Sequence, residues 1–186
     1  MIACLDACVL YPTVLREVLL GVAEAGLYRP VWSARIVEEW ARAAAKSGTA
    51  AEMQARGEIA LLRANWPGAE VAPGEDADLW LPDPGDVHVL ATARSAGANT
   101  IVTFNLKDFP KRELGRFDIV ALHPDAWLYA FWRQEPDIVR GVVVRVHDTA
   151  AQLLGRAIPM RELMKRARLP RLGKAVAGNS RAPTRL

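Results

Sequence analysis

The sequence predicts an α/β fold with three layers, in which helices cover both faces of a central parallel sheet of about four to five strands. Two observations predict this fold class. Short apolar segments alternate with amphipathic helical segments over residues 1–135, and helical patterns without intervening strands follow. The 186 residues suffice for one sizeable domain with an appendage. We therefore predict a domain over 1–135, a helical extension over 136–168 and a basic, flexible tail over 169–186.

The first part of the chain supplies the first two strands and three helices. Asp6 ends an apolar run, Gly26 follows a segment with helical spacing of apolar residues, and Ser33 is the expected N-cap of the next helix. In chain order we predict a strand over 1–5, a helix over 13–25, a strand over 27–32, a helix over 33–46 and a helix over 51–65.

The next part begins with an irregular segment over 68–85, which is rich in proline and glycine and contains a short strand near Val71. Asp86 opens a helix that Gly97 ends. In chain order we then predict a strand over 100–103, a polar loop over 105–110, a strand over 119–121 and helices over 124–132, 137–154 and 159–168.

Composition limits the class of protein. Hydrophobic residues make up 51% of the chain and charged residues 24%, which is typical of a globular domain. No uninterrupted apolar run approaches the roughly 18 residues of a transmembrane helix, and the features of a secretory signal are absent, so we expect a cytoplasmic protein without membrane association. The two cysteines, Cys4 and Cys8, are expected as small buried hydrophobic residues, with a thiol–metal site or a disulfide as alternatives.

Charge is distributed unevenly. Residues 163–186 hold seven basic residues and no acidic one, whereas residues 1–162 hold 17 basic and 21 acidic residues. A basic arm of this kind binds phosphates, and a merely solvated tail is the alternative. The candidate phosphate-binding residues of this arm, for RNA or another polyanion, are Lys165, Arg166, Arg168, Arg171 and Lys174.

Four acidic residues are candidate metal ligands: Asp6, Glu39, Asp86 and Asp108. Asp6 stands in an apolar stretch, where an unpaired charge would cost several kcal/mol. In a parallel α/β sheet the crevice lies at the carboxyl ends of the strands, where these residues are expected to meet. Two carboxylates 4 Å apart repel by roughly 4 kcal/mol at an effective dielectric constant near 20, so a divalent cation would stabilise the cluster. Oxygen ligands favour magnesium or manganese.

Each residue also has a structural interpretation. Asp86 can be an N-cap, Asp108 can close an Asx-turn, and Glu39 can be an exposed helical glutamate. Asp83 competes with Asp86 as the metal ligand. Three scattered histidines lack the spacing of zinc ligands and are interpreted as structural: His88, His123 and His147.

Four segments carry a resemblance to a known family. They read L-D-A-C-V-L-Y-P at 5–12, S-A-R-I-V-E-E-W at 33–40, L-P-D-P-G-D-V-H-V-L-A-T-A at 81–93 and V-T-F-N-L-K-D-F-P at 102–110. In order and spacing they resemble PIN-domain ribonucleases, in particular the VapC-like toxins of type II toxin–antitoxin systems. The region 137–186 resembles the helical extension of one branch of that family.

The resemblance implies a PIN-like fold and a hydrolase that cleaves RNA phosphodiester bonds with Mg²⁺ or Mn²⁺. It makes the four acids both catalytic and metal-binding, with Glu39 preferred over Glu38, and it gives Thr103 and Asn105 supporting roles in orienting a carboxylate or a water on the metal ion. The implied partners are transfer RNA or ribosomal RNA, a cognate antitoxin and a second copy of the chain. A non-catalytic PIN-fold binding or regulatory module and a DNA- or flap-directed nuclease are the alternative functions.

Overall fold

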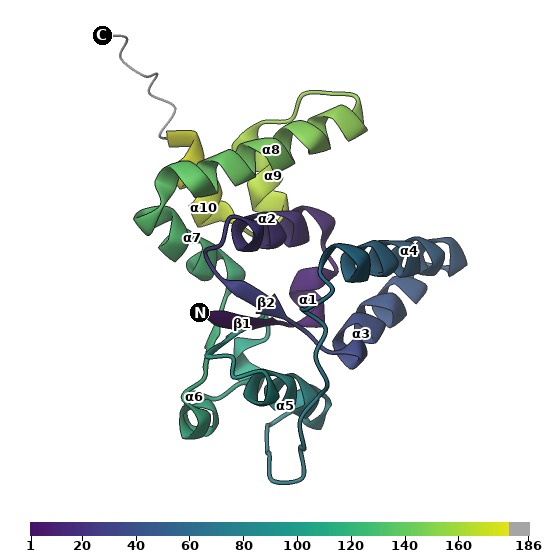
Figure 1. Ribbon diagram of the computed structural model, residues 1–186. Coiled ribbons are helices and arrows are strands. Elements are labelled where there is room, and N and C mark those ends of the chain that lie inside the picture. Colours follow the sequence, from purple (N-terminus) through teal and green to yellow (C-terminus); the bar gives the residue numbers. More distant parts are fainter. Residues whose placement is uncertain (179–186) are drawn as a thin grey trace. The chain divides into compact units, whose positions relative to one another are not determined.

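The computed structural model describes residues 1–178, which form two compact units (Figure 1). Residues 1–11 and 26–123 form the first, which we call the sheet unit. Residues 12–25 pack with residues 124–178 to form the second, the helical unit. The predicted domain boundary at 135 does not coincide with this division, because the early segment 12–25 packs with C-terminal helices.

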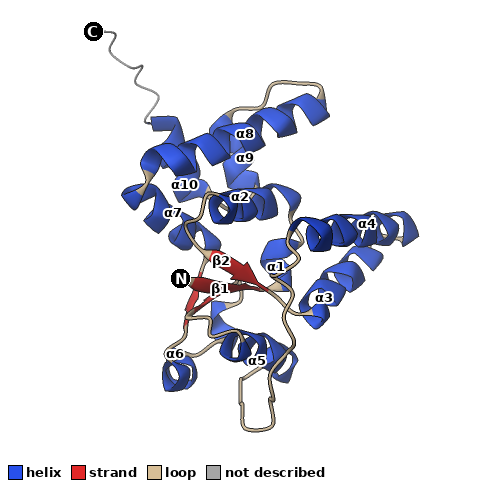
Figure 2. Cartoon of the chain, in the orientation of Figure 1, coloured by secondary structure: helices blue, strands red, loops and turns tan. Residues whose placement is uncertain are grey.

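Within the described residues, the sheet unit contains one four-stranded sheet in which every neighbouring pair is parallel (Figure 2). The strands are β1 (Ile2–Leu5), β2 (Arg29–Val31), β3 (Thr100–Val102) and β4 (Val120–Leu122), in the order β2-β1-β3-β4. The register places Leu5 of β1 opposite Val102 of β3, so the chain leaves both central strands at the same edge. Both residues are fully buried, as expected for central strands of a parallel sheet.

Helices and short 3₁₀ turns complete the sheet unit: α1 (Ala7–Leu10), α3 (Ala34–Ala45), α4 (Thr49–Asn65), η1 (Pro84–Asp86), α5 (Val87–Ser95), η2 (Leu106–Asp108), α6 (Lys111–Leu114) and η3 (Gly115–Phe117). Helix α5 packs against β1 and β3, and α3 packs against α1 and α4. The predicted N-cap of α3 is confirmed, since the hydroxyl of Ser33 accepts a hydrogen bond from the Ile36 N–H at 3.4 Å. The strand expected near Val71 is a single parallel bridge between Trp32 and Glu70.

The helical unit consists of α2 (Thr13–Glu24), α7 (Pro124–Gln134), α8 (Pro136–Leu154), α9 (Met160–Arg166) and α10 (Pro170–Gly178). Helix α8 packs against α2 and α7, and α10 packs against α7 and α9. Glycine permits two of these contacts. A Cβ atom at Gly21 of α2 would lie 2.7 Å from Cγ1 of Val142, and one at Gly173 of α10 would lie 2.5 Å from Cβ of Met164. Larger residues at these positions would force the helices apart.

A buried carboxylate holds the C-terminal helix in place. Oδ2 of Asp125 on α7 accepts a hydrogen bond from the Arg171 N–H and Oδ1 accepts one from the Leu172 N–H, both at 2.9 Å, at the first turn of α10. The guanidinium of Arg171 also lies 3.9 Å from the ring centroid of Tyr129, and Leu172 is fully buried. The prediction of a flexible tail is therefore wrong for residues 170–178, while its remainder, 179–186, lies outside the described residues.

Replacing Asp125 with alanine is expected to lower the free energy of unfolding by about 1–2 kcal/mol, because α10 loses two charge-assisted hydrogen bonds at its N-terminus. Thermal unfolding and the rate of proteolysis near Arg168 measure the effect. Asp137, exposed in the first turn of α8, is the matched control, and its alanine variant is expected to stay within about 0.5 kcal/mol of wild type. Equal stability of the two variants would contradict the proposed anchoring.

The predicted fold class, an α/β fold with a central parallel sheet and a helical extension, is confirmed. Helices are found near the predicted ranges, including α8 over Pro136–Leu154 and α9 over Met160–Arg166. Among the helices of residues 1–178, none is both long and apolar enough to cross a membrane.

Candidate functional site

Asp6 is positioned where the two central strands end. Its carboxylate is only 4% exposed, and its Oδ2 accepts hydrogen bonds from the Thr103 hydroxyl at 2.6 Å and the Cys8 thiol at 3.1 Å. Thr103 directly follows β3 as Asp6 follows β1, so the parallel register brings the two together. Within the described residues no side chain donates to Oδ1 of Asp6. The carboxylate is thus held through one oxygen, while the other remains able to bind a ligand.

The cysteines are not joined to each other: Cys4 is buried in β1, and Cys8 is half-buried in α1. Burial and the charge of Asp6 raise the pKa of the Cys8 thiol to about 12. Burial, with a contribution from Asp6, also raises the pKa of the Cys4 thiol. Cys8 is therefore a protonated hydrogen-bond donor to Asp6, a role that its interpretation as a small hydrophobic residue does not include.

Asp86 shows that the predicted acids occupy one region. It directly precedes α5, yet its side chain makes no capping hydrogen bond, so the N-cap interpretation does not account for its carboxylate. Burial raises its pKa to about 6, with further contributions from the negative charges of Asp6, Asp83, Asp108 and Glu39. The carboxylates of Asp6, Glu39, Asp86 and Asp108 are therefore electrostatically coupled, and we call these four side chains the acidic cluster.

Asp83, the competing candidate, has a local structural role. It is exposed and is the N-cap residue of η1, where its Oδ1 accepts a hydrogen bond from the Gly85 N–H at 2.8 Å. The structure therefore engages Asp83 in turn formation, whereas the Asp86 carboxylate has no such engagement.

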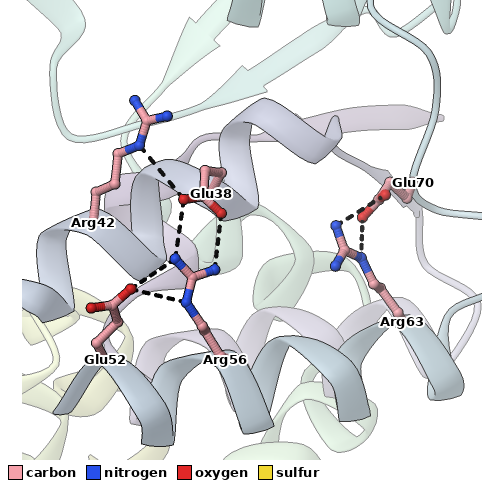
Figure 3. Close-up of polar contacts among 6 residues, drawn as sticks. All are labelled: Glu38, Arg42, Glu52, Arg56, Arg63 and Glu70. Atoms are coloured by element: carbon pink, nitrogen blue, oxygen red, sulfur yellow. Dashed lines mark hydrogen bonds and ion pairs between the residues drawn. The ribbon is translucent and has the colours of Figure 1, made fainter. Parts of the chain in front are cut away.

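The two neighbouring glutamates of α3 make different contacts. Glu38 lies in an exposed network of ion pairs between α3 and α4, where Arg56 donates to it at 3.1 and 3.2 Å (Figure 3). These hydrogen bonds lower the pKa of Glu38. Oε1 of Glu39 instead lies 2.8 Å from Nε2 of His88 and 3.5 Å from Nε of Arg35. Glu39, and not Glu38, contributes to the raised pKa of Asp86.

Asp108 and Asn105 lie at the short turn η2 after β3. The carboxylate of Asp108 is half-buried, and Nζ of the exposed Lys107 lies 4.0 Å from it. No hydrogen bond of an Asx-turn involves this carboxylate within residues 1–178. The backbone N–H of Asn105 donates to the Thr103 hydroxyl at 3.0 Å, but its side chain is exposed and orients no carboxylate of the described chain. Of the two residues expected to orient a carboxylate, Thr103 does so through its hydrogen bond to Asp6.

The chemistry of the acidic cluster fits a hard divalent cation. All four side chains offer carboxylate oxygens, the donors that Mg²⁺ and Mn²⁺ prefer, and their mutual repulsion would be relieved by positive charge. Over residues 1–178, no three His, Cys, Asp or Glu side chains stand close enough together to hold a metal ion.

The candidate RNA-binding residues belong to the helical unit and are all exposed. They are Lys165, Arg166, Arg168, Arg171 and Lys174, on α9, on α10 and on the link between them. Arg166 pairs with Glu162, and Arg171 lies over Tyr129.

Sequence reasoning missed two residues that contact the acidic cluster. His88 was interpreted as structural and Cys8 as hydrophobic, yet they contact Glu39 and Asp6 respectively. The one local signal for these two residues is that each stands two positions after an acid of the cluster. The contact of His88 with Glu39 joins residues 49 positions apart and depends on tertiary structure.

Comparison with known proteins gives the family. A protein-family model described as a PIN domain matches residues 3–107, which include Asp6, Glu39 and Asp86 and end one residue before Asp108. Searches of curated proteins and of solved structures found no match. PIN domains are generally metal-dependent nucleases. Because the match covers more than half of the chain, the chain belongs to the PIN domain family.

Proposed function

We propose that this chain is a metal-dependent endoribonuclease whose acidic cluster binds Mg²⁺ or Mn²⁺. One observation carries the proposal: burial, together with the negative charges of Asp6, Asp83, Asp108 and Glu39, raises the pKa of the half-buried Asp86 to about 6. Crowded carboxylates destabilise a fold unless a cation or a proton neutralises them. Metal binding gives a reason for carboxylates that influence one another's charge in this way, and the PIN domain match supports the same chemistry.

The residues of the chain have distinct tasks in this proposal. Thr103 and Cys8 fix the Asp6 carboxylate through Oδ2, and Asp86, directly before α5, is near enough for the charge of Asp6 to raise its pKa. A bound divalent cation would supply a Lewis acid that activates water and neutralises charge on the phosphodiester. No covalent intermediate with the protein is needed, and the expected products carry a 5′-phosphate and a 3′-hydroxyl.

We further propose that the substrate is a single-stranded loop of a structured RNA, with transfer RNA or ribosomal RNA as the first candidates. Unpaired bases in loops are accessible to a protein, and phosphates attract basic side chains. Five exposed basic residues of the helical unit support this: Lys165, Arg166, Arg168, Arg171 and Lys174.

The biological role that we propose is that of a toxin held inactive by a cognate antitoxin, with the chain acting as a homodimer. The support is the resemblance of the segments 5–12, 33–40, 81–93 and 102–110 to VapC-like toxins. Membership of the PIN domain family supports a nuclease activity. The toxin role depends on the resemblance of these segments.

A cleavage assay with matched substrates tests the activity. We expect the purified chain to open a covalently closed circular RNA in Mn²⁺ or Mg²⁺, to stop in EDTA, and to leave DNA of the same sequence intact. Opening of a circle demonstrates internal cleavage. Preferential cleavage of DNA or of flap substrates would favour the DNA-directed alternative, and RNA binding without cleavage would favour the non-catalytic module.

A further inference from the structure

His88 is a buried polar ring that touches the acidic cluster. It lies on α5, two residues after Asp86, and only 3% of its side chain is exposed. Its Nε2 lies 2.8 Å from Oε1 of Glu39. Among the described residues, neither ring nitrogen has a partner with the full geometry of a hydrogen bond. The ring is therefore desolvated and lies against a single carboxylate without forming a hydrogen bond to it.

Packing alone does not explain this choice of residue. Its neighbours Val89 and Leu90 on α5 are fully buried and apolar, and an apolar side chain at 88 would avoid the desolvation of two ring nitrogens. Buried polar groups in folded proteins are nearly always hydrogen-bonded, so one that is not asks for a functional reason. The contact with Glu39 supplies that reason.

Glu39 lies between two basic groups in different environments. Arg35, one turn earlier on α3, approaches Oε1 at 3.5 Å, and its side chain is 53% exposed against 33% for that of Glu39. Exposed ion pairs of long side chains hold their partners weakly. His88 approaches the same oxygen more closely from the buried side, where the ring cannot move freely.

We propose that His88 is a positioning residue: its Nε2 lies 2.8 Å from Oε1 of Glu39 without the alignment of a hydrogen bond, and when the acidic cluster binds a divalent cation its N–H donates to that oxygen and holds the carboxylate in place. The inference rests on the proposed function and extends it to a residue outside the four carboxylates. Carboxylate ligands of metal ions usually depend on such a hydrogen-bonding partner for their orientation.

The variants His88→Leu and His88→Gln test the proposal, with Mn²⁺ binding followed by calorimetry and RNA cleavage measured in parallel. We expect His88→Leu to weaken Mn²⁺ binding by about 10- to 100-fold and His88→Gln, which keeps an N–H donor, to weaken it less. At subsaturating Mn²⁺, kcat should fall while KM for RNA stays within about twofold, because His88 positions a carboxylate and does not touch the RNA. A purely structural role would lower the melting temperature and leave Mn²⁺ affinity unchanged.

Two further variants make the result specific. Glu38→Gln changes the neighbouring glutamate in its exposed ion pairs and is expected to bind Mn²⁺ like wild type. Since His88 acts through Glu39, the double variant His88→Leu/Glu39→Gln should bind Mn²⁺ no more weakly than Glu39→Gln alone. Independent, additive losses would contradict this order of action.

The outcomes separate this inference from the proposed function. If wild type binds Mn²⁺ and cleaves RNA, and a folded His88→Leu protein binds Mn²⁺ equally well, the positioning role is wrong and the nuclease assignment stands. If wild type neither binds Mn²⁺ nor cleaves RNA, both are wrong. Should His88→Leu fail to fold by circular dichroism, His88→Met, which also lacks a donor, takes its place.

Discussion

Replacing Asp6 with asparagine is expected to lower the rate of RNA cleavage by about 100-fold or more, the equivalent of roughly 3 kcal/mol of transition-state stabilisation. The substitution removes the charge of the most buried carboxylate of the acidic cluster and keeps its shape. The fold should survive, because the Thr103 hydroxyl can donate to or accept from the amide at the present distance of 2.6 Å. Loss of activity would therefore reflect lost chemistry and not unfolding.

Cleavage of RNA in Mn²⁺ and Mn²⁺ binding by calorimetry measure this effect. Asp78→Asn is the matched control, since Asp78 is exposed and pairs with Arg94, and it should cleave RNA like wild type. The same pair of variants examines the toxin proposal: expression of wild type and Asp78→Asn should arrest the growth of host cells, and Asp6→Asn should not. Full cleavage by a folded Asp6→Asn protein would remove the proposed site.

Replacing Asp86 with asparagine is expected to change stability in opposite directions with and without metal. In EDTA at pH 7.5 the variant should be more stable than wild type by roughly 1–2 kcal/mol, since it has no charge to bury and is not repelled by the other carboxylates; this range allows for solvent screening of a half-buried group. That difference corresponds to a melting temperature about 3–6 °C higher. In saturating Mn²⁺ wild type should gain several degrees, and the variant should gain much less.

The pH dependence follows from the direction of the pKa shift of Asp86. Its pKa rises from the ordinary value of 3.8 to about 6, so the folded protein keeps a proton that the unfolded chain has already released. This contribution to stability is fully present below pH 3.8 and is lost as the pH rises through about 6. Metal-free wild type should therefore lose stability relative to Asp86→Asn between about pH 4 and pH 7.

Thermal unfolding in EDTA at several pH values measures this difference. Asp83→Asn, at the exposed N-cap of η1, is a control for the removal of a nearby charge, and it should keep the Mn²⁺-dependent rise in melting temperature. Identical Mn²⁺-dependent shifts for wild type and Asp86→Asn would argue against a shared ion.

Local patterns were sufficient to predict much of the fold. The apolar run that ends at Asp6 is β1, the hydroxyl of Ser33 caps α3, and the segment from Thr100 is β3. These elements follow from periodicity and capping chemistry, which depend on near neighbours in the chain. The resemblance to PIN-domain ribonucleases gave Thr103 a supporting role, and in the structure its hydroxyl donates a hydrogen bond to Asp6 where the two central parallel strands end.

Other contacts depend on residues far apart in the chain. The sequence by itself determined the α/β class, the order of the elements and the acids of the candidate site. Only the tertiary structure decided that His88 meets Glu39 and that Asp125 caps α10, in a stretch whose basic composition predicted flexibility. Composition describes how a segment interacts with water, whereas a buried carboxylate from another helix can stabilise the same segment through hydrogen bonds that no local pattern encodes.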